Sequence, residues 1–282
     1  MTRRELAAES LTPVVAEMCH RINVSLPEDL RGALEQGRDR EQLACARETL
    51  EVLLANAEIA AREDLPLCQD TGMVVVFVEQ GEDLCLHGDL AAAINAGVAE
   101  AYVGGYLRRS LLANPLQRNT NTGDNTPAFV HLERVPGDRL TLRLAAKGGG
   151  SENMSALWML SPSEGRAGLV KAIVARVAEA GGRPCPPLVL GVGVGSNFEG
   201  VARLAKRALF RRLGEPSPDP ELASLEAEIL ERVNATGVGP MGLGGVTTAL
   251  AVHVLSAPCH LATMPVALNV QCHSARHATV VI

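Results

Sequence analysis

Three of the seven cysteines in this chain of 282 residues stand where a polar loop meets an apolar segment. They are Cys68 in LPLCQDTG, Cys185 in GRPCPPL and Cys272 in NVQCHSARH. A cysteine in such a place can bind a metal, remain a reduced thiol or pack against the core, and the residues alone leave these roles open. The odd number of cysteines, without an export signal, argues against a disulfide framework, and the absence of C-x-x-C argues against zinc-ribbon and thioredoxin sites.

The other cysteines have different surroundings. Cys19 and Cys45 lie in helical patterns of Ala, Leu and Met, and Cys85 alternates with two leucines, so we expect these three thiols to be packed in the core. Cys259, in APCHLA, fits neither group.

Cys68 is followed directly by Gln69, Asp70 and Thr71, which place an amide, a carboxylate and a hydroxyl beside the thiol. Such groups can orient a small polar ligand by hydrogen bonds. The same order, Asp-Thr-Gly ahead of an apolar run, is also typical of an Asx turn, in which the carboxylate accepts from its own backbone. Both interpretations remain open at this point.

Three glycine-rich loops, KGGGS, GVGVGSN and TGVGPMGLGG, suggest places where backbone approaches a ligand, although tight turns are the alternative. No Walker A sequence occurs in the chain. In GVGVGSN, Ser196 stands where a dinucleotide motif needs its third glycine, and the loop with Gly237, Gly239 and Gly242 follows a helical pattern rather than a strand. Nucleotide binding is therefore not indicated.

Composition limits the class of protein. The chain is 47% hydrophobic and 21% charged, with a net charge of −6 and only 2% aromatic residues. The acidic balance and the scarcity of stacking side chains argue against nucleic-acid binding. No apolar run is long enough to cross a membrane, and no secretory signal is recognisable, so a cytoplasmic location is expected.

Hydrophobic periodicity predicts alternating helices and strands. Helices are expected over residues 43–57 (with Asp39 as N-cap), 89–112, 152–160, 163–180, around 203–207, and 221–233. Strands are expected over 73–78, from 187, and over 246–254, with a hairpin that turns at residues 136–138. We expect an α/β (mixed α+β) fold in which helices flank a small mixed sheet, within a single domain spanning residues 1–282.

Five motifs, in order from Leu65 to the C-terminus, resemble the class I, iron–sulfur-dependent fumarase and L(+)-tartrate dehydratase family. They are LPLCQDTGMVVVF, KGGGSENMSALWML, PCPPLVLGVGVGSNFEGVARLAKRAL, GVGPMGLGG and CHLATMPVALNVQCHSARH. The likeness is to the α subunit of two-subunit members, which is equivalent to the N-terminal domain of single-chain members. It implies a fold of that N-terminal type, with a helical part over 1–64 and a cluster- and substrate-binding part over 65–282.

The resemblance implies a 4Fe-4S cluster held by Cys68, Cys185 and Cys272. Three thiolates leave one iron with an open position, and an open iron can act as a Lewis acid toward a hydroxyl and a carboxylate. Dehydration of a 2-hydroxy dicarboxylate needs such help, because hydroxide is a poor leaving group.

The resemblance also implies a set of substrate contacts: Gln69, Asp70, Arg108, Gly148, Gly149, Gly150 and His260. Asp70 and His260 are the implied catalytic residues, and the glycines would offer backbone N–H groups to a carboxylate. Arg109 is the alternative to Arg108. His273, Arg276 and His277, which follow the last ligand, would bind the substrate or the partner.

In this family a catalytic threonine, further arginines and a lysine come from a second domain, whereas this chain ends ten residues after Cys272. The resemblance therefore implies a separate β subunit, an α2β2 assembly, and no activity for this chain alone. A small dicarboxylate is the implied substrate, with no nucleic acid and no membrane as partners.

Three classes of function are left open, namely a hydro-lyase, a sensor and a zinc protein. The first expectation is fumarate hydration to L-malate, chosen because that reaction serves the tricarboxylic acid cycle; dehydration of L(+)-tartrate to oxaloacetate is the alternative. A cluster-bearing sensor without catalysis would have no use for Gln69, Asp70, Arg108 and His260. A zinc protein based on Cys259, His260 and Cys272 would leave Cys68 unexplained.

Overall fold

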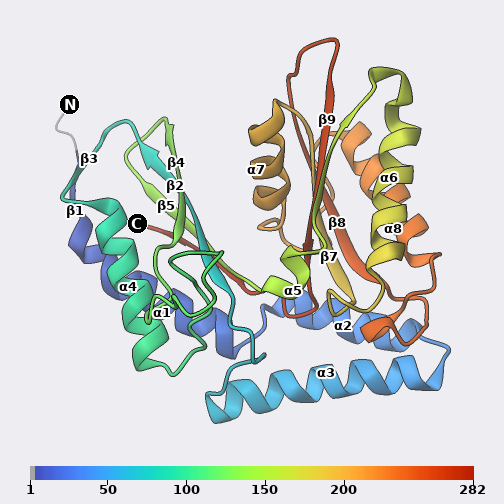
Figure 1. The fold of residues 1–282 in the computed structure, drawn as a ribbon, viewed down its shortest axis with the longest axis horizontal. Helices are drawn as coiled ribbons and strands as arrows, with labels where there is room; N and C mark the ends of the chain where they lie inside the picture. Colours follow the sequence, from blue (N-terminus) through green and yellow to red (C-terminus); the bar gives the residue numbers. More distant parts are fainter. Residues whose placement is uncertain (1–3) are drawn as a thin grey trace. The chain divides into compact units, whose positions relative to one another are not determined.

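The strands of the chain form two four-stranded sheets and one two-stranded sheet in the computed structural model, which describes residues 4–282. Helices flank both larger sheets, so the expected mixed α/β class is confirmed, although the strands are shared among three sheets and not gathered in one (Figure 1). Contacts divide the chain into two units. The first comprises the described residues up to Pro27, Ala57–Gly149 and Arg276–Ile282; the second comprises Glu28–Asn56 and Gly150–Ala275.

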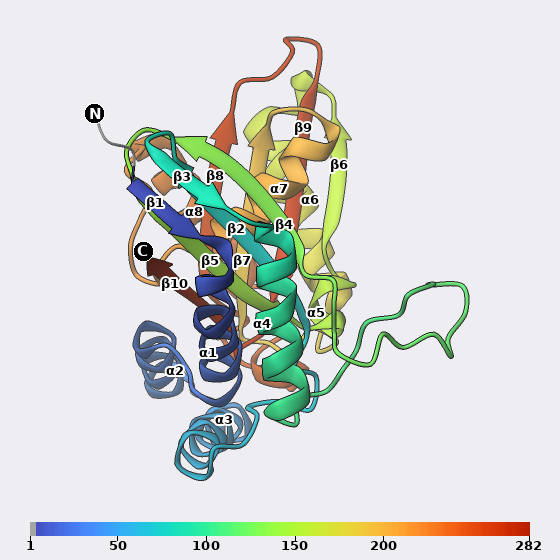
Figure 2. The ribbon, with the colours of Figure 1, turned by 90° about the vertical axis from the view of Figure 1, so that its left-hand side faces the viewer.

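The first unit is built on the sheet β10-β5-β2-β4. Its elements are β1 (Arg4–Ala7), α1 (Leu11–Val24), β2 (Met73–Gly81), β3 (Leu84–His87), α4 (Leu90–Gly104), β4 (Phe129–Val135), β5 (Leu140–Lys147) and β10 (His277–Val281). Alternate residues of β2, including Val74, Val76 and Val78, point into a core that α1 and α4 cover from one face (Figure 2). The two helices lie side by side on the sheet.

The predicted hairpin is wrong in its pairing, although both of its strands exist. β2 lies between β4 and β5, parallel to the first and antiparallel to the second. The connection from β4 to β5 therefore crosses the end of β2, where the Gly81 N–H donates to Arg139 O at 2.8 Å. A Cβ at Gly81 would overlap the Gly137 carbonyl, so only glycine allows this crossing.

The second unit is built on the sheet β6-β9-β7-β8. Its elements are α2 (Glu28–Arg40), β6 (Ala156–Leu160), α6 (Gly165–Ala180), β7 (Leu188–Gly195), α7 (Phe198–Ala208), α8 (Pro220–Asn234), β8 (Ala249–Ala257) and β9 (Met264–Gln271). The chain passes from one unit to the other within α3 (Ala44–Glu63) and within α5 (Gly149–Glu152). α6 and α8 cover one face of the sheet and α7 covers the other (Figure 1).

The glycines of GVGVG serve the packing of α7. A Cβ at Gly191 would overlap Ala205 O, and one at Gly193 would overlap Val201 O. The helix backbone therefore rests directly on β7. This loop and strand are thus a packing device, not a phosphate-binding one.

Several expected boundaries are wrong for identifiable reasons. Asp39 lies in the last turn of α2 and caps nothing, and residues 156–160 form the strand β6, because their side chains pair with β9. The helix expected over 89–112 ends at Gly104, before Gly105. Cys45 is exposed and Cys85 is half-buried, so neither is packed in the core as expected, whereas Cys19 is buried as predicted.

The segment 1–64 is helical as expected apart from β1, with residues 1–3 outside the described range, and its helices are divided between the two units. In residues 4–282 we find no helix with the length and apolar character that a membrane crossing requires.

Candidate functional site

The segment from Cys68 to Gly72 forms an irregular turn in the first unit, between α3 and β2. The Gly72 N–H donates to Asp70 Oδ1 at 3.0 Å, so the Asx turn foreseen as an alternative is present. The Asp70 N–H points at the Cys68 sulfur, with N and Sγ 3.4 Å apart. Gln69 is exposed, and its Oε1 lies 3.3 Å from the same sulfur. The turn therefore gathers one backbone donor and one amide around the thiol.

Side chains donate hydrogen bonds to the backbone carbonyl groups of this turn, and sequence reasoning missed most of these donors. The Tyr102 hydroxyl donates to Thr71 O at 2.7 Å and to Gly72 O at 3.2 Å, while Asn125 Nδ2 donates to Gly72 O at 3.0 Å. Both side chains are fully buried at 0% exposure, so the turn is held rigidly from behind. One signal was available: Tyr102 is one of only two tyrosines in the chain.

Tyr102→Phe is expected to destabilise the chain by about 1–3 kcal/mol, because Thr71 O loses its buried donor. Burial raises the pKa of the Tyr102 phenol, so the hydroxyl keeps its proton in the folded chain. The stabilising contribution is therefore complete below about pH 10, the ordinary pKa of tyrosine, and declines as pH rises through the higher folded value. Denaturant unfolding of both proteins at rising pH measures it; equal stability of the two proteins at neutral pH would contradict the assignment.

The carboxylate of Asp70 is engaged on both oxygens. While Oδ1 accepts from Gly72, Oδ2 accepts from the Gly149 N–H at 2.8 Å. We expected Gly148, Gly149 and Gly150 to offer their N–H groups to a substrate. The Gly149 N–H already donates to Asp70, so it is not available in this conformation.

The structure favours Arg108 over Arg109 as the exposed cation beside this turn. Thr71 Oγ1 donates to Arg108 O at 3.0 Å, so the Arg108 backbone is tied to the turn. Its side chain is exposed and makes no hydrogen bond or ion pair within residues 4–282. Arg109 instead donates to Gly123 O at 3.0 Å, inside the loop that follows α4.

Cys185 and Cys272 lie at one end of the sheet in the second unit. Cys185 precedes β7 and Cys272 follows β9, and in this antiparallel pair Val189 stands opposite Gln271. The His273 N–H donates to Cys185 O at 3.3 Å, and His273 Nδ1 lies 3.0 Å from the same oxygen. The backbone segments of the two cysteines are therefore in direct contact.

The three thiols predicted as ligands differ from the packed one. Cys68, Cys185 and Cys272 are half-buried, and Cys185 is held at φ +56°, a conformation that few side chains adopt. Burial raises the pKa of the Cys19 thiol to about 12, so that cysteine is inert as a ligand.

The loop of TGVGPMGLGG packs against the Cys185 segment by backbone contacts. The Met241 N–H donates to Pro186 O at 2.8 Å, and a Cβ at Gly182 would lie 2.7 Å from Met241 O. The glycines here allow the backbone of the loop to contact the backbone of the Cys185 segment, and this contact supports that segment.

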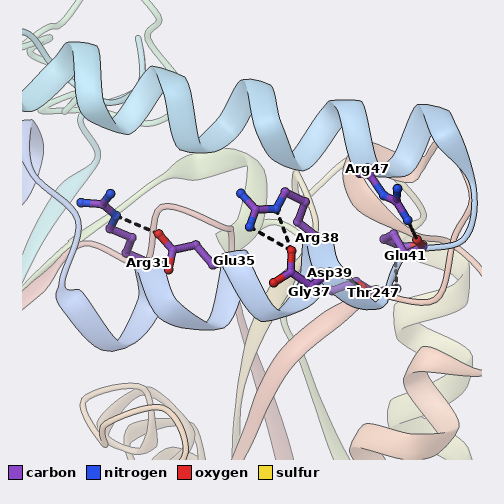
Figure 3. Close-up of polar contacts among 8 residues, drawn as sticks. All are labelled: Arg31, Glu35, Gly37, Arg38, Asp39, Glu41, Arg47 and Thr247. Carbon is purple, nitrogen blue, oxygen red and sulfur yellow. Dashed lines mark hydrogen bonds and ion pairs between the residues drawn. The ribbon is translucent and has the colours of Figure 1, made fainter.

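Glu41 anchors the far end of this loop (Figure 3). Its carboxylate is buried, at 1% exposure, and accepts from Val246 N at 3.0 Å and Thr247 N at 2.7 Å. Arg47 donates to its carbonyl at 2.8 Å. A buried acid that is unrelated to any motif thus supports the site, and sequence reasoning missed it.

Glu41→Gln is expected to cost about 1–3 kcal/mol of stability, because an amide accepts with one oxygen where the carboxylate uses both. The matched control is Glu35→Gln on α2, the helix that ends at Arg40 just before Glu41. It breaks an exposed pair with Arg31 at 3.1 Å and should cost no more than about 0.5 kcal/mol. Chemical unfolding of both variants makes the comparison. Equal losses would show that the Glu41 contacts contribute nothing particular.

His260 is not brought near Cys272, although both belong to the second unit. It lies on the exposed loop between β8 and β9, beyond the end of β9 opposite to Cys272. The eight residues of β9 span about 26 Å at the rise of a strand. The twelve-residue spacing that relates His260 to Cys272 in the sequence therefore corresponds to the whole length of a strand.

The predicted site residues thus fall into three places. The first unit brings together Cys68, Gln69, Asp70, Arg108, Gly148 and Gly149; the second brings together Cys185 and Cys272; Gly150 begins the second unit and His260 stands apart. Residues 4–282 contain no group of three Cys, His, Asp or Glu side chains placed so that they could hold a metal ion.

Comparison with known proteins identifies the class. The family profile described as "Fumarate hydratase (Fumerase)" matches residues 12–281. The chain therefore belongs to the fumarate hydratase family, which is a family of hydro-lyases.

Relatives within the family carry a more particular name. A protein from Methanocaldococcus jannaschii, named provisionally as L(+)-tartrate dehydratase subunit alpha, is 40% identical over 95% of this chain and 96% of its own length. The L(+)-tartrate dehydratase subunit alpha of Escherichia coli K12 is 31% identical over 100% of this chain and 93% of its own length. The protein of that name from the Escherichia coli strain UTI89 is 32% identical over 99% of this chain and 92% of its own length.

Proposed function

We propose that this chain is the α subunit of an iron–sulfur hydro-lyase that dehydrates L(+)-tartrate to oxaloacetate. The observation that carries the proposal is the similarity to L(+)-tartrate dehydratase α subunits over nearly the full length of both chains. It favours tartrate over fumarate, which was the first expectation. Fumarate hydration is the second candidate, because the matching family profile bears that name.

The proposed cofactor is a 4Fe-4S cluster on Cys68, Cys185 and Cys272. The donor set fits, because none of the three cysteines is in a disulfide and all three are half-buried at loop–strand junctions. The Asp70 N–H directed at the Cys68 sulfur is the kind of hydrogen bond that tunes such clusters. When bound, the cluster would supply an open iron as Lewis acid for departure of the substrate hydroxyl.

The remaining groups are proposed to bind and orient the dicarboxylate. The exposed guanidinium of Arg108 is suited to pair with a substrate carboxylate, and Gln69 can donate to a substrate oxygen. Asp70, fixed by Gly72 and Gly149, presents a carboxylate for the hydroxyl or its proton. Gly148 and Gly150 adjoin Gly149 in the sequence and are the proposed backbone donors.

A β subunit is proposed as the partner, because the relatives are named as alpha subunits. An α2β2 assembly is our working arrangement. His260 is proposed to bind the substrate and take part in catalysis. Because it lies a strand's length from Cys272, we propose that its imidazole acts away from that cysteine, at the site of a neighbouring chain of the assembly. A cytoplasmic location is proposed because a reducing compartment keeps the seven thiols free.

The test is a comparison of substrates for the assembled enzyme. The chain is produced with its β subunit, reconstituted anaerobically with iron and sulfide, and assayed with L(+)-tartrate, fumarate and L-malate. We expect kcat/KM for L(+)-tartrate to exceed that for fumarate by at least about 100-fold, which corresponds to about 2.7 kcal/mol of transition-state discrimination. The α chain alone should be inactive.

A kcat/KM that is higher for fumarate than for L(+)-tartrate would contradict tartrate dehydration and support fumarate hydration. A complex that holds the cluster but turns over none of the three substrates would support the sensor function and contradict catalysis.

A further inference from the structure

Arg276 is the largest fully buried side chain in the described part of the protein, at 2% exposure. Its Nη1 donates to Asn23 Oδ1 at 3.1 Å and also to the carbonyl of Asp70. Its Nε has no hydrogen-bond partner, and no carboxylate within residues 4–282 forms an ion pair with it. The guanidinium is therefore a buried cation whose contacts are two neutral oxygens.

Burying such a cation is unfavourable, because it costs several kcal/mol unless an opposite charge compensates. A neutral amide could satisfy two neutral acceptors equally well. The Asp70 carboxylate is a candidate anion. A Cβ built on Gly148 would lie 3.3 Å from Arg276 Nη2 and also 3.3 Å from Asp70 Oδ2, so the two groups flank this one glycine.

Asn23 fixes the guanidinium from the other side. It is buried at 0% exposure, and its Nδ2 donates to Cys19 O at 2.8 Å, one turn earlier in α1. Its own carbonyl accepts from the Leu67 N–H at 2.8 Å, immediately before Cys68. A continuous set of hydrogen bonds thus runs from α1 through Arg276 to the Asp70 peptide.

We propose that Arg276 is a positioning residue that acts through Asp70. Held by Asn23, it fixes the Asp70 carbonyl and places a positive charge beside the Asp70 carboxylate, so that this carboxylate keeps its direction toward Gly149. This corrects the expectation that Arg276 binds the substrate or the partner, because a buried guanidinium of this kind faces the turn. The expected effect of Arg276 on kcat rests on the proposed function. The expected effect of Arg276 on the conformation of the Asp70 turn does not.

The first test is a double-mutant cycle in the assembled, cluster-loaded enzyme. Arg276→Gln is expected to lower kcat by about 10- to 100-fold with little change in KM, because substrate contacts remain while Asp70 loses its orientation. Arg276→Lys, which keeps the charge, should recover part of the rate. In an Asp70→Asn background Arg276→Gln should cost nothing more, since the two residues act as a unit. Losses that multiply, or an effect on KM alone, would overturn the proposal.

The second test needs no turnover. Amide hydrogen exchange of the peptide that covers residues 67–72 should accelerate in Arg276→Gln and not in Arg143→Gln, a matched arginine of the first unit whose Nη1 lies 2.8 Å from Glu79. Unchanged exchange in Arg276→Gln overturns the proposal. If the wild type proves inactive on all dicarboxylates, the proposed function fails, while this readout still decides on Arg276.

Asn23→Ala covers the case in which the arginine variants do not fold. It removes the side-chain acceptor that orients the guanidinium, together with the Asn23 donor to Cys19 O, and leaves Arg276 itself in place. The same acceleration of exchange over 67–72 is expected at smaller amplitude, and its absence counts against the proposal.

Discussion

Cys68→Ser is expected to strip the reconstituted protein of its cluster and to leave less than about 1% of the hydro-lyase activity. Wild type should bind roughly four iron and four sulfide per chain, which is the content of one 4Fe-4S cluster. The serine hydroxyl is not deprotonated at neutral pH and replaces a thiolate poorly. In addition, Cys68 is the one proposed ligand that belongs to the first unit, so its loss leaves two of the three proposed thiolates. Iron and acid-labile sulfide after anaerobic reconstitution are the measurements.

The matched control for this experiment is Cys45→Ser. Cys45 is exposed on α3 and is not among the proposed ligands, so its loss should leave both iron and sulfide unchanged. Zinc in place of iron, or full iron content in Cys68→Ser, would remove the cluster from the proposal.

Gly72→Ala is expected to destabilise the chain by about 3 kcal/mol and to disable the turn that carries Cys68 and Asp70. Gly72 has φ +76°, where an L-residue is strained by roughly 1–2 kcal/mol. The added Cβ would also lie 2.7–2.8 Å from the backbone atoms of Lys147, which belongs to β5 and cannot yield easily. Denaturant unfolding gives the loss of stability, and cluster content and kcat report the damage to the turn.

Gly32→Ala separates this effect from the general consequence of adding a methyl group. Gly32 lies inside α2, where a Cβ would meet nothing within 4 Å. The substitution should stabilise by about 0.5–1 kcal/mol, because alanine is the better helix former. If Gly72→Ala proves equally harmless, the conformation described for the turn is wrong.

The local sequence pattern predicted helices and strands correctly where the packing of an element agrees with its own secondary-structure preference. The strand at Met73 and the helices α6, α7 and α8 were predictable, because hydrophobic spacing matches the face that each one buries. The strand β6 was mistaken for a helix, because its residues become a strand only by pairing with β9. For the same reason β4 and β5 looked like a hairpin: nothing in their sequence announces that β2 lies between them.

The support of the site was harder to predict than the site residues themselves. Glu41 and Asn23 resemble ordinary helix residues in the sequence, yet each is buried and satisfies backbone groups of a distant segment. Hydrogen bonds between residues 206 positions apart, such as those of Glu41 with Thr247 and of Arg276 with Asp70, follow no local spacing.

The sequence by itself determined the chemistry that this protein can offer, namely three unusual cysteines, the Gln-Asp-Thr-Gly turn and an arginine beside it, since residue types and their order are what a motif records. Only the tertiary structure decided that the Asp70 carboxylate is engaged by Gly72 and Gly149, and that His260 lies a strand's length from Cys272. The physical reason is that burial and hydrogen bonding depend on which distant segments the folded chain brings into contact, and no local pattern carries that information.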